Sequence, residues 1–169
     1  MLYSIYIPFY NDEHPMKSTA YTHQVAVNAF LIFNEKFLLL KRATKPLIWT
    51  PPGGRLNRDE DPVVGLQREV FEETALQITV QQPVTSWFGR FNSSQLFSVD
   101  YLCTTQESAV ILSAEHSDYR WLTIEHLKAG EFVYFGNEKG FHLSDFHLAW
   151  CTYLLNQKKI KDLERYIIH

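Results

Sequence analysis

Runs of apolar residues, separated by short polar breaks, divide this chain into strands and helices. Polar residues 34–36 separate two strongly apolar runs, as expected for a β-hairpin. Residues 92–94, Asn-Ser-Ser, separate two longer runs in the same way and have the composition of a turn. The strands that this pattern predicts are 25–33, 37–42, 78–91, 96–105 and a short one at 119–122.

Helical spacing of apolar residues marks three further segments. Asp61 is a favourable N-cap and Pro62 suits the first helical position, so a helix is expected from there to about Thr74. The residues of this helix expected to share one buried face are Val63, Leu66, Val70 and Thr74. Two more helices are expected at 124–129 and at 143–155, the latter with Ser144 as its cap.

Strands and helices mixed in this order predict the α/β class, with a mixed sheet that carries helices on both faces. At 169 residues the chain is expected to form one domain with a sizeable core. Residues 1–20 are expected to add an N-terminal arm or an extra strand, with a homodimer as one possible use of it.

Composition narrows the function classes. Hydrophobic residues make up 46% of the chain and aromatic residues 15%, as in a globular protein. The net charge of −3 gives no basic field for a nucleic-acid backbone, so binding of duplex nucleic acid is disfavoured. The N-terminus has no basic stretch and is interrupted by Pro8, which argues against a signal peptide or a membrane span. Cys103 and Cys151 lie far apart, which is typical of reduced residues in a cytoplasmic protein.

The strongest chemical signal is a group of acids on the first expected helix. Glu69, Glu72 and Glu73 project from one face, where their charges repel unless a cation lies among them. Arg68 is the one basic neighbour in the segment, so a divalent metal is the expected neutraliser. Carboxylate ligands without nearby His or Cys favour Mg²⁺ or Mn²⁺. The carbonyl of Gly54, in a loop where two glycines allow close approach, is a further candidate ligand.

At these residues the chain resembles the Nudix hydrolase family. The signature of that family reads Gly, five residues, Glu, seven residues, then Arg-Glu-aliphatic-any-Glu-Glu-any-Gly-aliphatic. Eight of its nine fixed positions are matched here, by Gly54, Glu60, Arg68, Glu69, Val70, Glu72, Glu73 and Leu76. The departure is Ala75, which stands in place of the glycine that ends the helix and is expected to alter the local turn.

The resemblance implies an α/β/α sandwich and hydrolysis of a diphosphate bond in a nucleoside diphosphate joined to another group. It implies that Glu72 and Glu73 bind the metal, with the Gly54 carbonyl assisting. Glu69 is either another ligand or the base that orients the attacking water. Arg68 is expected to pair with Glu60 and a motif glutamate, which would hold the carboxylates in register.

A narrower resemblance is to GDP-mannose mannosyl hydrolases, a branch of the same family. Arg55 directly after the two glycines, and His116 before Tyr-Arg-Trp-Leu, match that branch, in which this His acts as base. That branch lacks an acid at the position of Glu69, which this chain keeps. Attack on phosphorus is therefore favoured over displacement at a sugar carbon, and Arg55 is interpreted as a phosphate-binding cation.

Other candidates are weaker. Glu115 is a possible further metal ligand from the loop before the last short strand, although a lone loop residue is more often only solvated. Trp49 and the group Phe88, Phe91 and Phe97 could stack on a nucleobase, or they could belong to the core. Three functions stay open: a Mg²⁺-dependent pyrophosphohydrolase, which the complete acid set favours; a GDP-mannose-type glycosyl hydrolase; and a non-catalytic nucleotide-binding module.

Overall fold

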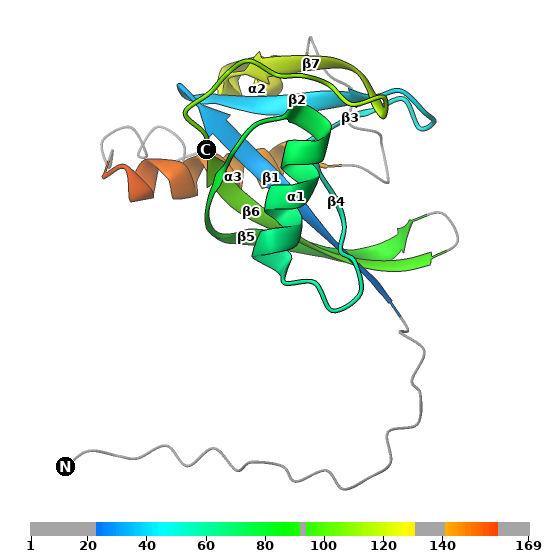
Figure 1. Ribbon diagram of the computed structural model, residues 1–169. Coiled ribbons are helices and arrows are strands. Elements are labelled where there is room, and N and C mark those ends of the chain that lie inside the picture. Colours follow the sequence, from blue (N-terminus) through cyan, green and yellow to red (C-terminus); the bar gives the residue numbers. More distant parts are fainter. Residues whose placement is uncertain (1–22, 92–93, 131–140, 159–169) are drawn as a thin grey trace, which may run out of the picture.

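The computed structural model describes residues 23–91, 94–130 and 141–158 (Figure 1). The elements there are β1 (Gln24–Phe33), β2 (Lys36–Arg42), β3 (Trp49–Thr50), β4 (Gly53–Arg55), α1 (Pro62–Thr74), β5 (Thr79–Phe91), β6 (Ser94–Thr104), β7 (His116–Leu122), α2 (Ile124–Ala129) and α3 (Leu143–Asn156). None of these helices is long and apolar enough to cross a membrane. Residues 1–20, for which an arm or extra strand is expected, lie outside the described ranges.

The strands form one mixed sheet, as predicted. Its main order is β3-β2-β1-β6-β5, while β4 pairs with β1 and β7 pairs with β2. The β1–β6 pair is parallel and the other pairs are antiparallel. Helix α1 lies on one face of this sheet, and α2 and α3 lie on the other (Figure 1). The predicted α/β/α architecture is therefore confirmed.

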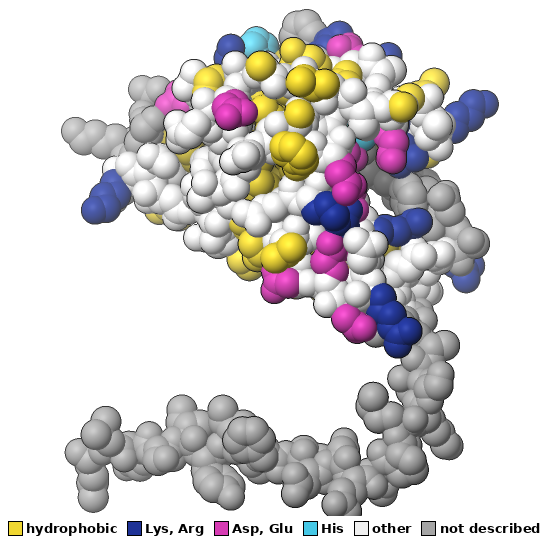
Figure 2. Space-filling model, viewed as in Figure 1, with side chains coloured by type: hydrophobic (Ala, Val, Ile, Leu, Met, Phe, Trp, Pro, Cys, Tyr) yellow, Lys and Arg dark blue, Asp and Glu magenta, His cyan; other side chains and the backbone are white. Residues whose placement is uncertain are grey.

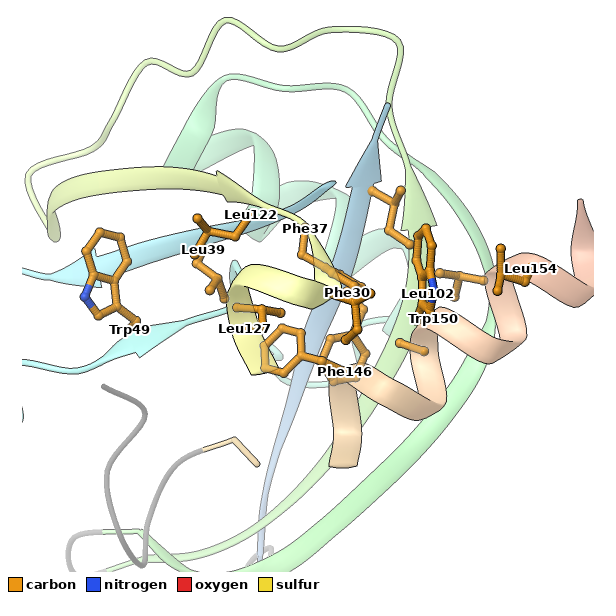
Figure 3. Close-up of a cluster of buried hydrophobic side chains, with 13 residues drawn as sticks. Phe30, Phe37, Leu39, Trp49, Leu102, Leu122, Leu127, Phe146, Trp150 and Leu154 are labelled. Carbon is orange, nitrogen blue, oxygen red and sulfur yellow. The ribbon is translucent and has the colours of Figure 1, made fainter. Parts of the chain in front are cut away.

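Two hydrophobic clusters hold the layers together because β1 and β2 bury both of their faces. Alternate residues of β1 serve the two clusters: Ala29 and Leu31 face α1, while Phe30 and Ile32 face α3. On the α1 side they contact Leu66 of the helix. Figure 3 shows the other cluster, in which Phe30, Phe146 and Trp150 pack together while Trp49 lies at the far end. Burial on both faces explains the continuous apolar runs in the sequence.

The first helix begins where the sequence predicts. Oδ1 of Asp61 accepts hydrogen bonds from the backbone N–H groups of Val63 and Val64, at 2.9 and 3.1 Å. Of the four residues expected to be buried, Leu66, Val70 and Thr74 are buried, but Val63 is 39% exposed. The prediction for Val63 is wrong because the first turn extends beyond the strands that the helix covers.

Ala75 ends the helix in the left-handed conformation, with φ of 58°. Its N–H donates to the carbonyl of Phe71 at 2.8 Å. The turn is therefore the one that a glycine would make, not an altered one as expected from the sequence. An alanine in this conformation strains the backbone, because its Cβ approaches the neighbouring carbonyl.

Other boundaries differ from the prediction. β7 begins at His116, three residues before the predicted strand, because polar residues at its start pair with the end of β2. The short strands β3 and β4 were expected to be loop. Helix α3 begins at Leu143, so its N-cap is His142 and not Ser144. The N–H of His142 donates to Oδ2 of Asp145 at 2.8 Å, which closes the first turn.

A polar pair interrupts the α3 face of the sheet. Asn28 of β1 and Asp100 of β6 are direct neighbours across the strands, and Nδ2 of Asn28 donates to Oδ1 of Asp100 at 2.6 Å. Asp100 is 3% exposed. Burial raises its pKa to about 6, although the hydrogen bond from Asn28 opposes this shift. Together with the buried Ser98, two residues before Asp100, the pair forms a polar part of a face that also carries Phe30 and Leu102.

We expect Asp100→Asn to stabilise the protein at pH 7. The pKa of Asp100 is about 6 in the folded protein against an ordinary 3.8, so the folded state binds more protons between these values. The contribution of Asp100 to stability therefore falls as pH rises from about 4 to 6, and the variant should gain roughly 1.5–3 kcal/mol there. Denaturant unfolding at pH 4, 5, 6 and 7 measures this, and a stability difference that does not change with pH would contradict it.

We expect Ala75→Gly to stabilise the protein by about 0.5–1 kcal/mol, because glycine adopts the left-handed conformation without strain. Ala129→Gly, at the last residue of α2, is the matched control and should destabilise. Thermal unfolding of both variants provides the comparison. A lower melting temperature for Ala75→Gly would show that the left-handed conformation of Ala75 does not strain the backbone.

Candidate active site

Arg68 of α1 binds three carboxylates at once. Its Nε and Nη2 each donate to Glu60 at 2.8 Å, one to each carboxylate oxygen. Its Nη1 donates to Oε1 of Glu69 at 2.8 Å and to Oε2 of Glu72 at 3.2 Å. Figure 2 shows acidic and basic side chains gathered in a band on this side of the molecule. The predicted pairing of Arg68 with Glu60 and a motif glutamate is confirmed.

This network changes the electrostatic argument made from the sequence. The hydrogen bonds from Arg68 and from the N–H of Asn57 lower the pKa of Glu60 to about 2. The charges of Glu69 and Glu72 are likewise offset by the same guanidinium. The acidic face is therefore not left without a cation, and repulsion alone does not require a metal at Glu69 and Glu72.

Glu73 differs from its neighbours because it is buried and receives no guanidinium. It is 7% exposed, and Oε2 accepts a hydrogen bond from the N–H of Gly53 at 2.9 Å. Burial raises the pKa of Glu73 to about 8, and the charges of Glu69 and Glu115 add to this shift. A buried carboxyl group with a raised pKa is a site where a bound cation would stabilise the ionised form.

Gly53 and Gly54 bring the backbone of β4 against this cluster. A Cβ on Gly54 would overlap the carboxylate of Glu69. Gly53 has φ of 148°, and a Cβ there would collide with the carbonyl oxygen of Val27. At Gly53 the positive φ and the backbone clash exclude a side chain, whereas at Gly54 a methyl group would have to displace the Glu69 carboxylate. The Gly54 backbone therefore lies beside Glu69, as the sequence motif implies.

Two buried nitrogen atoms on the other side of Glu73 lack partners among the described residues. They are Nε of Arg42 and Nδ1 of His116. The two residues pair across β2 and β7, next to a register shift at Lys41/Arg42. Such irregularities redirect side chains and occur often beside active sites. Nε2 of His116 lies 3.7 Å from Oε1 of Glu73. Burial lowers the pKa of His116, the charge of Glu115 opposes this shift and the charge of Arg42 adds to it, so the neutral imidazole is favoured.

Arg42 was not among the candidates from the sequence. Its one sequence signal is its place at the end of an apolar strand, directly before the loop that leads to the glycines. Many strand-terminal arginines are only solvated, so this signal was weak. The structure adds the burial of its Nε and its electrostatic effect on Glu73.

The remaining candidates take different positions. Arg55 is exposed in β4, and its carbonyl accepts from Nη2 of Arg68 at 3.3 Å. The exposed Glu115 acts on Glu73 electrostatically. Trp49 is 6% exposed and packs in the core, with Arg120 5.0 Å from its ring centroid, so the proposed stacking of Trp49 on a nucleobase is wrong for this arrangement.

The aromatic group on the second hairpin is not core. Phe88 and Phe97 are 59% and 38% exposed and face each other across β5 and β6. The structure does not describe the side chain of Phe91. Exposed rings at the outer part of this hairpin keep the stacking alternative open for Phe88 and Phe97.

The donor set suits a hard divalent cation. Glu69, Glu72 and Glu73 offer carboxylate oxygens from one helix, and Gly54 offers a carbonyl beside Glu69. Within the described ranges, no three His, Cys, Asp or Glu side chains are already arranged around a common point. This is because Arg68 draws Glu69 and Glu72 toward itself while Gly53 holds Glu73. The residues present fit the cation chemically, because they offer hard oxygen donors.

Comparison with known sequences identifies the group to which this chain is similar. The family described as NUDIX domain matches residues 22–139. A MutT-like protein of Streptomyces ambofaciens is 29% identical over 101 residues, which are 60% of this chain and 64% of that protein. The chain thus spans less than two thirds of the length of this relative.

Solved structures show the same fold. The MutT protein from Methanosarcina mazei Go1 superposes with a TM-score of 0.63 at 23% identity, covering 80% of this chain and 96% of that one. A UDP-X diphosphatase superposes with a TM-score of 0.66 at 20% identity, covering 82% of this chain and 66% of that one. At these identities the likeness establishes the α/β/α fold and leaves the chemistry to the site residues.

We expect Gly54→Ala to reduce turnover by about 10–100-fold, because the added methyl group displaces the Glu69 carboxylate from the cluster. Gly130→Ala is the matched control. Gly130 has φ of 67° and open space around its Cβ position, so this substitution should lower stability but not turnover. Steady-state rates and melting temperatures of both variants test the difference. Full turnover in Gly54→Ala would separate Glu69 from the chemistry.

Proposed function

The chain belongs to the NUDIX family, and on this premise we propose that it is a divalent-cation-dependent pyrophosphohydrolase. Its proposed substrate is a nucleoside diphosphate joined through its terminal phosphate to another moiety. The proposed reaction is attack of water on phosphorus, which cleaves the diphosphate bond. The observation that carries the proposal is the set of acids on α1: Glu69 lies beside the Cβ position of Gly54, Glu73 accepts from the N–H of Gly53, and Glu72 shares Arg68 with Glu69.

The proposed cation-binding residues are Glu69, Glu72, Glu73 and the carbonyl of Gly54. A bound Mg²⁺ or Mn²⁺ would neutralise phosphate charge and lower the pKa of a water molecule. Glu73 is the central ligand in this proposal, because its buried carboxyl group gains most from a cation. Glu69 is either a further ligand or the base that orients water, and Glu115 is a candidate for either role from the opposite loop.

Two arginines are proposed to bind the phosphate groups of the substrate. Arg42 presents a buried Nε with no partner among the described residues, and a diphosphate oxygen is a suitable acceptor for a guanidinium. Arg55, exposed beside the same cluster, is proposed to bind a second phosphate oxygen. Arg68 orients the glutamates through its hydrogen bonds and is not proposed to touch substrate.

The substrate class rests on chemistry and on one neighbour. The net charge of −3 is compatible with a small phosphorylated substrate, which needs only a local cationic pocket. A structural neighbour described as a UDP-X diphosphatase supports a nucleoside diphosphate linked to a further group.

A second candidate function is release of a free sugar from a GDP-sugar by attack at carbon. The specific observation in its favour is the neutral imidazole of His116, 3.7 Å from Glu73, which could act as a base. Against it stands Glu69, which the mannosyl hydrolase branch lacks and which lies here against the Gly54 backbone. The retained acids also argue against a module that only binds nucleotide.

We expect Glu73→Gln to lower turnover by about 10³-fold or more, since it removes the charge of the central ligand. Mg²⁺ should raise the melting temperature of the wild-type protein but not that of Glu73→Gln. Glu107→Gln, an exposed acid outside the cluster, is the control and should keep both properties. Rates and thermal scans at millimolar Mg²⁺ provide the measurement, and retained turnover in Glu73→Gln would refute the metal-site assignment.

Hydrolysis of GDP-mannose in ¹⁸O-labelled water distinguishes attack at phosphorus from attack at carbon. We expect a nucleoside monophosphate and a phosphorylated sugar, with the label in a phosphate group. His116→Ala should reduce this rate by about 10²-fold or less, because another base is present. Mass spectrometry locates the label. Label in free mannose, with GDP as co-product, would establish the second candidate function instead.

A further inference from the structure

Asn28 and Asp100 lie against the backbone that holds Glu73. Asn28 pairs with Gly53 across β1 and β4, and the N–H of Gly53 donates to Oε2 of Glu73. Asn28 pairs on its other side with Asp100. One row across three strands therefore runs from Asp100 through Asn28 to Gly53, and its end is the donor that orients Glu73.

The backbone of β1 lies directly against Gly53, and the side chain of Asn28 lies beside it. A Cβ on Gly53 would overlap the carbonyl oxygen of Val27, and it would lie 2.7 Å from Cα of Asn28 and 3.1 Å from its Oδ1. Nδ2 of Asn28 points the other way and donates to Asp100 at 2.6 Å. A carboxylate can only accept hydrogen bonds, so Asp100 fixes which end of the Asn28 amide faces Gly53.

A buried pair of this kind needs a reason beyond stability. Asp100 is 3% exposed, and Leu102, two residues along the same strand, shows that this face accepts apolar side chains. A carboxylate that is removed from water destabilises the fold unless its hydrogen bonds compensate. Asp100 is thus buried in the sheet, and Asn28 connects it to Gly53 on the neighbouring strand.

We propose that Asp100 and Asn28 are positioning residues, which hold the Gly53 backbone so that its N–H fixes Glu73 for cation binding. The proposal rests on the proposed function, because it takes Glu73 as a metal ligand. Neither residue is proposed to touch substrate or cation. Both act through the Gly53 amide.

Three variants and one control test this. Asn28→Ala removes the side chain beside Gly53, Asp100→Leu removes the acceptor but keeps volume, and Asp100→Asn keeps an acceptor and is the conservative rescue. Asn28 is only half-buried, so its alanine variant is expected to fold even if Asp100→Leu does not. Thr105→Ala, which removes a buried hydroxyl with two hydrogen bonds at the other end of β6, controls for general destabilisation.

Two readouts are measured on the full chain without substrate. The first is Mn²⁺ affinity from the electron paramagnetic resonance signal of the free ion. The second is the hydrogen-exchange rate of the Gly53 amide by nuclear magnetic resonance in metal-free protein. We expect about 3–10-fold weaker Mn²⁺ binding and faster Gly53 exchange in Asn28→Ala and Asp100→Leu. Asp100→Asn should stay within about 2-fold of the wild-type protein in both readouts. Thr105→Ala should have the Mn²⁺ affinity and Gly53 exchange rate of the wild-type protein, although its melting temperature is lower.

The outcomes separate the two proposals. Unchanged Gly53 exchange in Asn28→Ala overturns the positioning role, and so does a Thr105→Ala variant that loses Mn²⁺ affinity to the same extent. Wild-type protein that binds no Mn²⁺ refutes the cation site, while the exchange rates still decide whether the pair holds Gly53. Faster Gly53 exchange in Asn28→Ala with unchanged Mn²⁺ affinity would show that the pair holds the Gly53 backbone without affecting cation binding. That result also overturns the proposal.

Discussion

The close approach of the Gly53–Gly54 backbone to α1 is the constraint on which the site depends. A side chain at either glycine would collide, with the β1 backbone at Gly53 and with the Glu69 carboxylate at Gly54. The approach is fixed from both ends. On the helix, Asp61 caps the first turn and Leu66 and Val70 bury one face against the sheet. On the sheet, β4 pairs with β1 over three residues, so the glycines cannot withdraw from the carboxylates.

The acids around this contact are stabilised in two different ways. Glu60, Glu69 and Glu72 share the guanidinium of Arg68, which lowers the pKa of Glu60 to about 2 and keeps it ionised. Glu73 instead lies in a buried setting that raises its pKa to about 8, while the Gly53 N–H and the charge of Arg42 oppose this shift. A cation bound among these acids would therefore stabilise the ionised form of Glu73 most, while Arg68 holds the other carboxylates in position.

The sequence predicted the parts of this arrangement that follow from periodicity and spacing. The cap at Asp61, the helix to Thr74 and the main strands could be read from local pattern, and the pairing of Arg68 with Glu60 followed from the resemblance to the Nudix family. Tertiary contacts decided the rest. The burial of Trp49 depends on a hydrophobic cluster whose members come from segments far apart in sequence, and the role of Arg42 depends on its pairing with His116 across 74 residues. The hydrogen bond between Asn28 and Asp100 likewise joins residues 72 positions apart.

Several features that weaken the fold lie within this one region. Glu73 and Asp100 are buried carboxyl groups with raised pKa values, and Ala75 closes helix α1 in a conformation that favours glycine. Local rules and global structure usually agree in natural proteins, so such conflicts point to functional constraint. The proposed cation would account for the conflict at Glu73, and the proposed positioning of Gly53 would account for the conflict at Asp100. Neither the cation nor the Gly53 backbone accounts for Ala75. Its N–H donates to the carbonyl of Phe71, and a glycine at this position would make the same hydrogen bond. Its strain therefore marks a position where stability can rise without loss of activity.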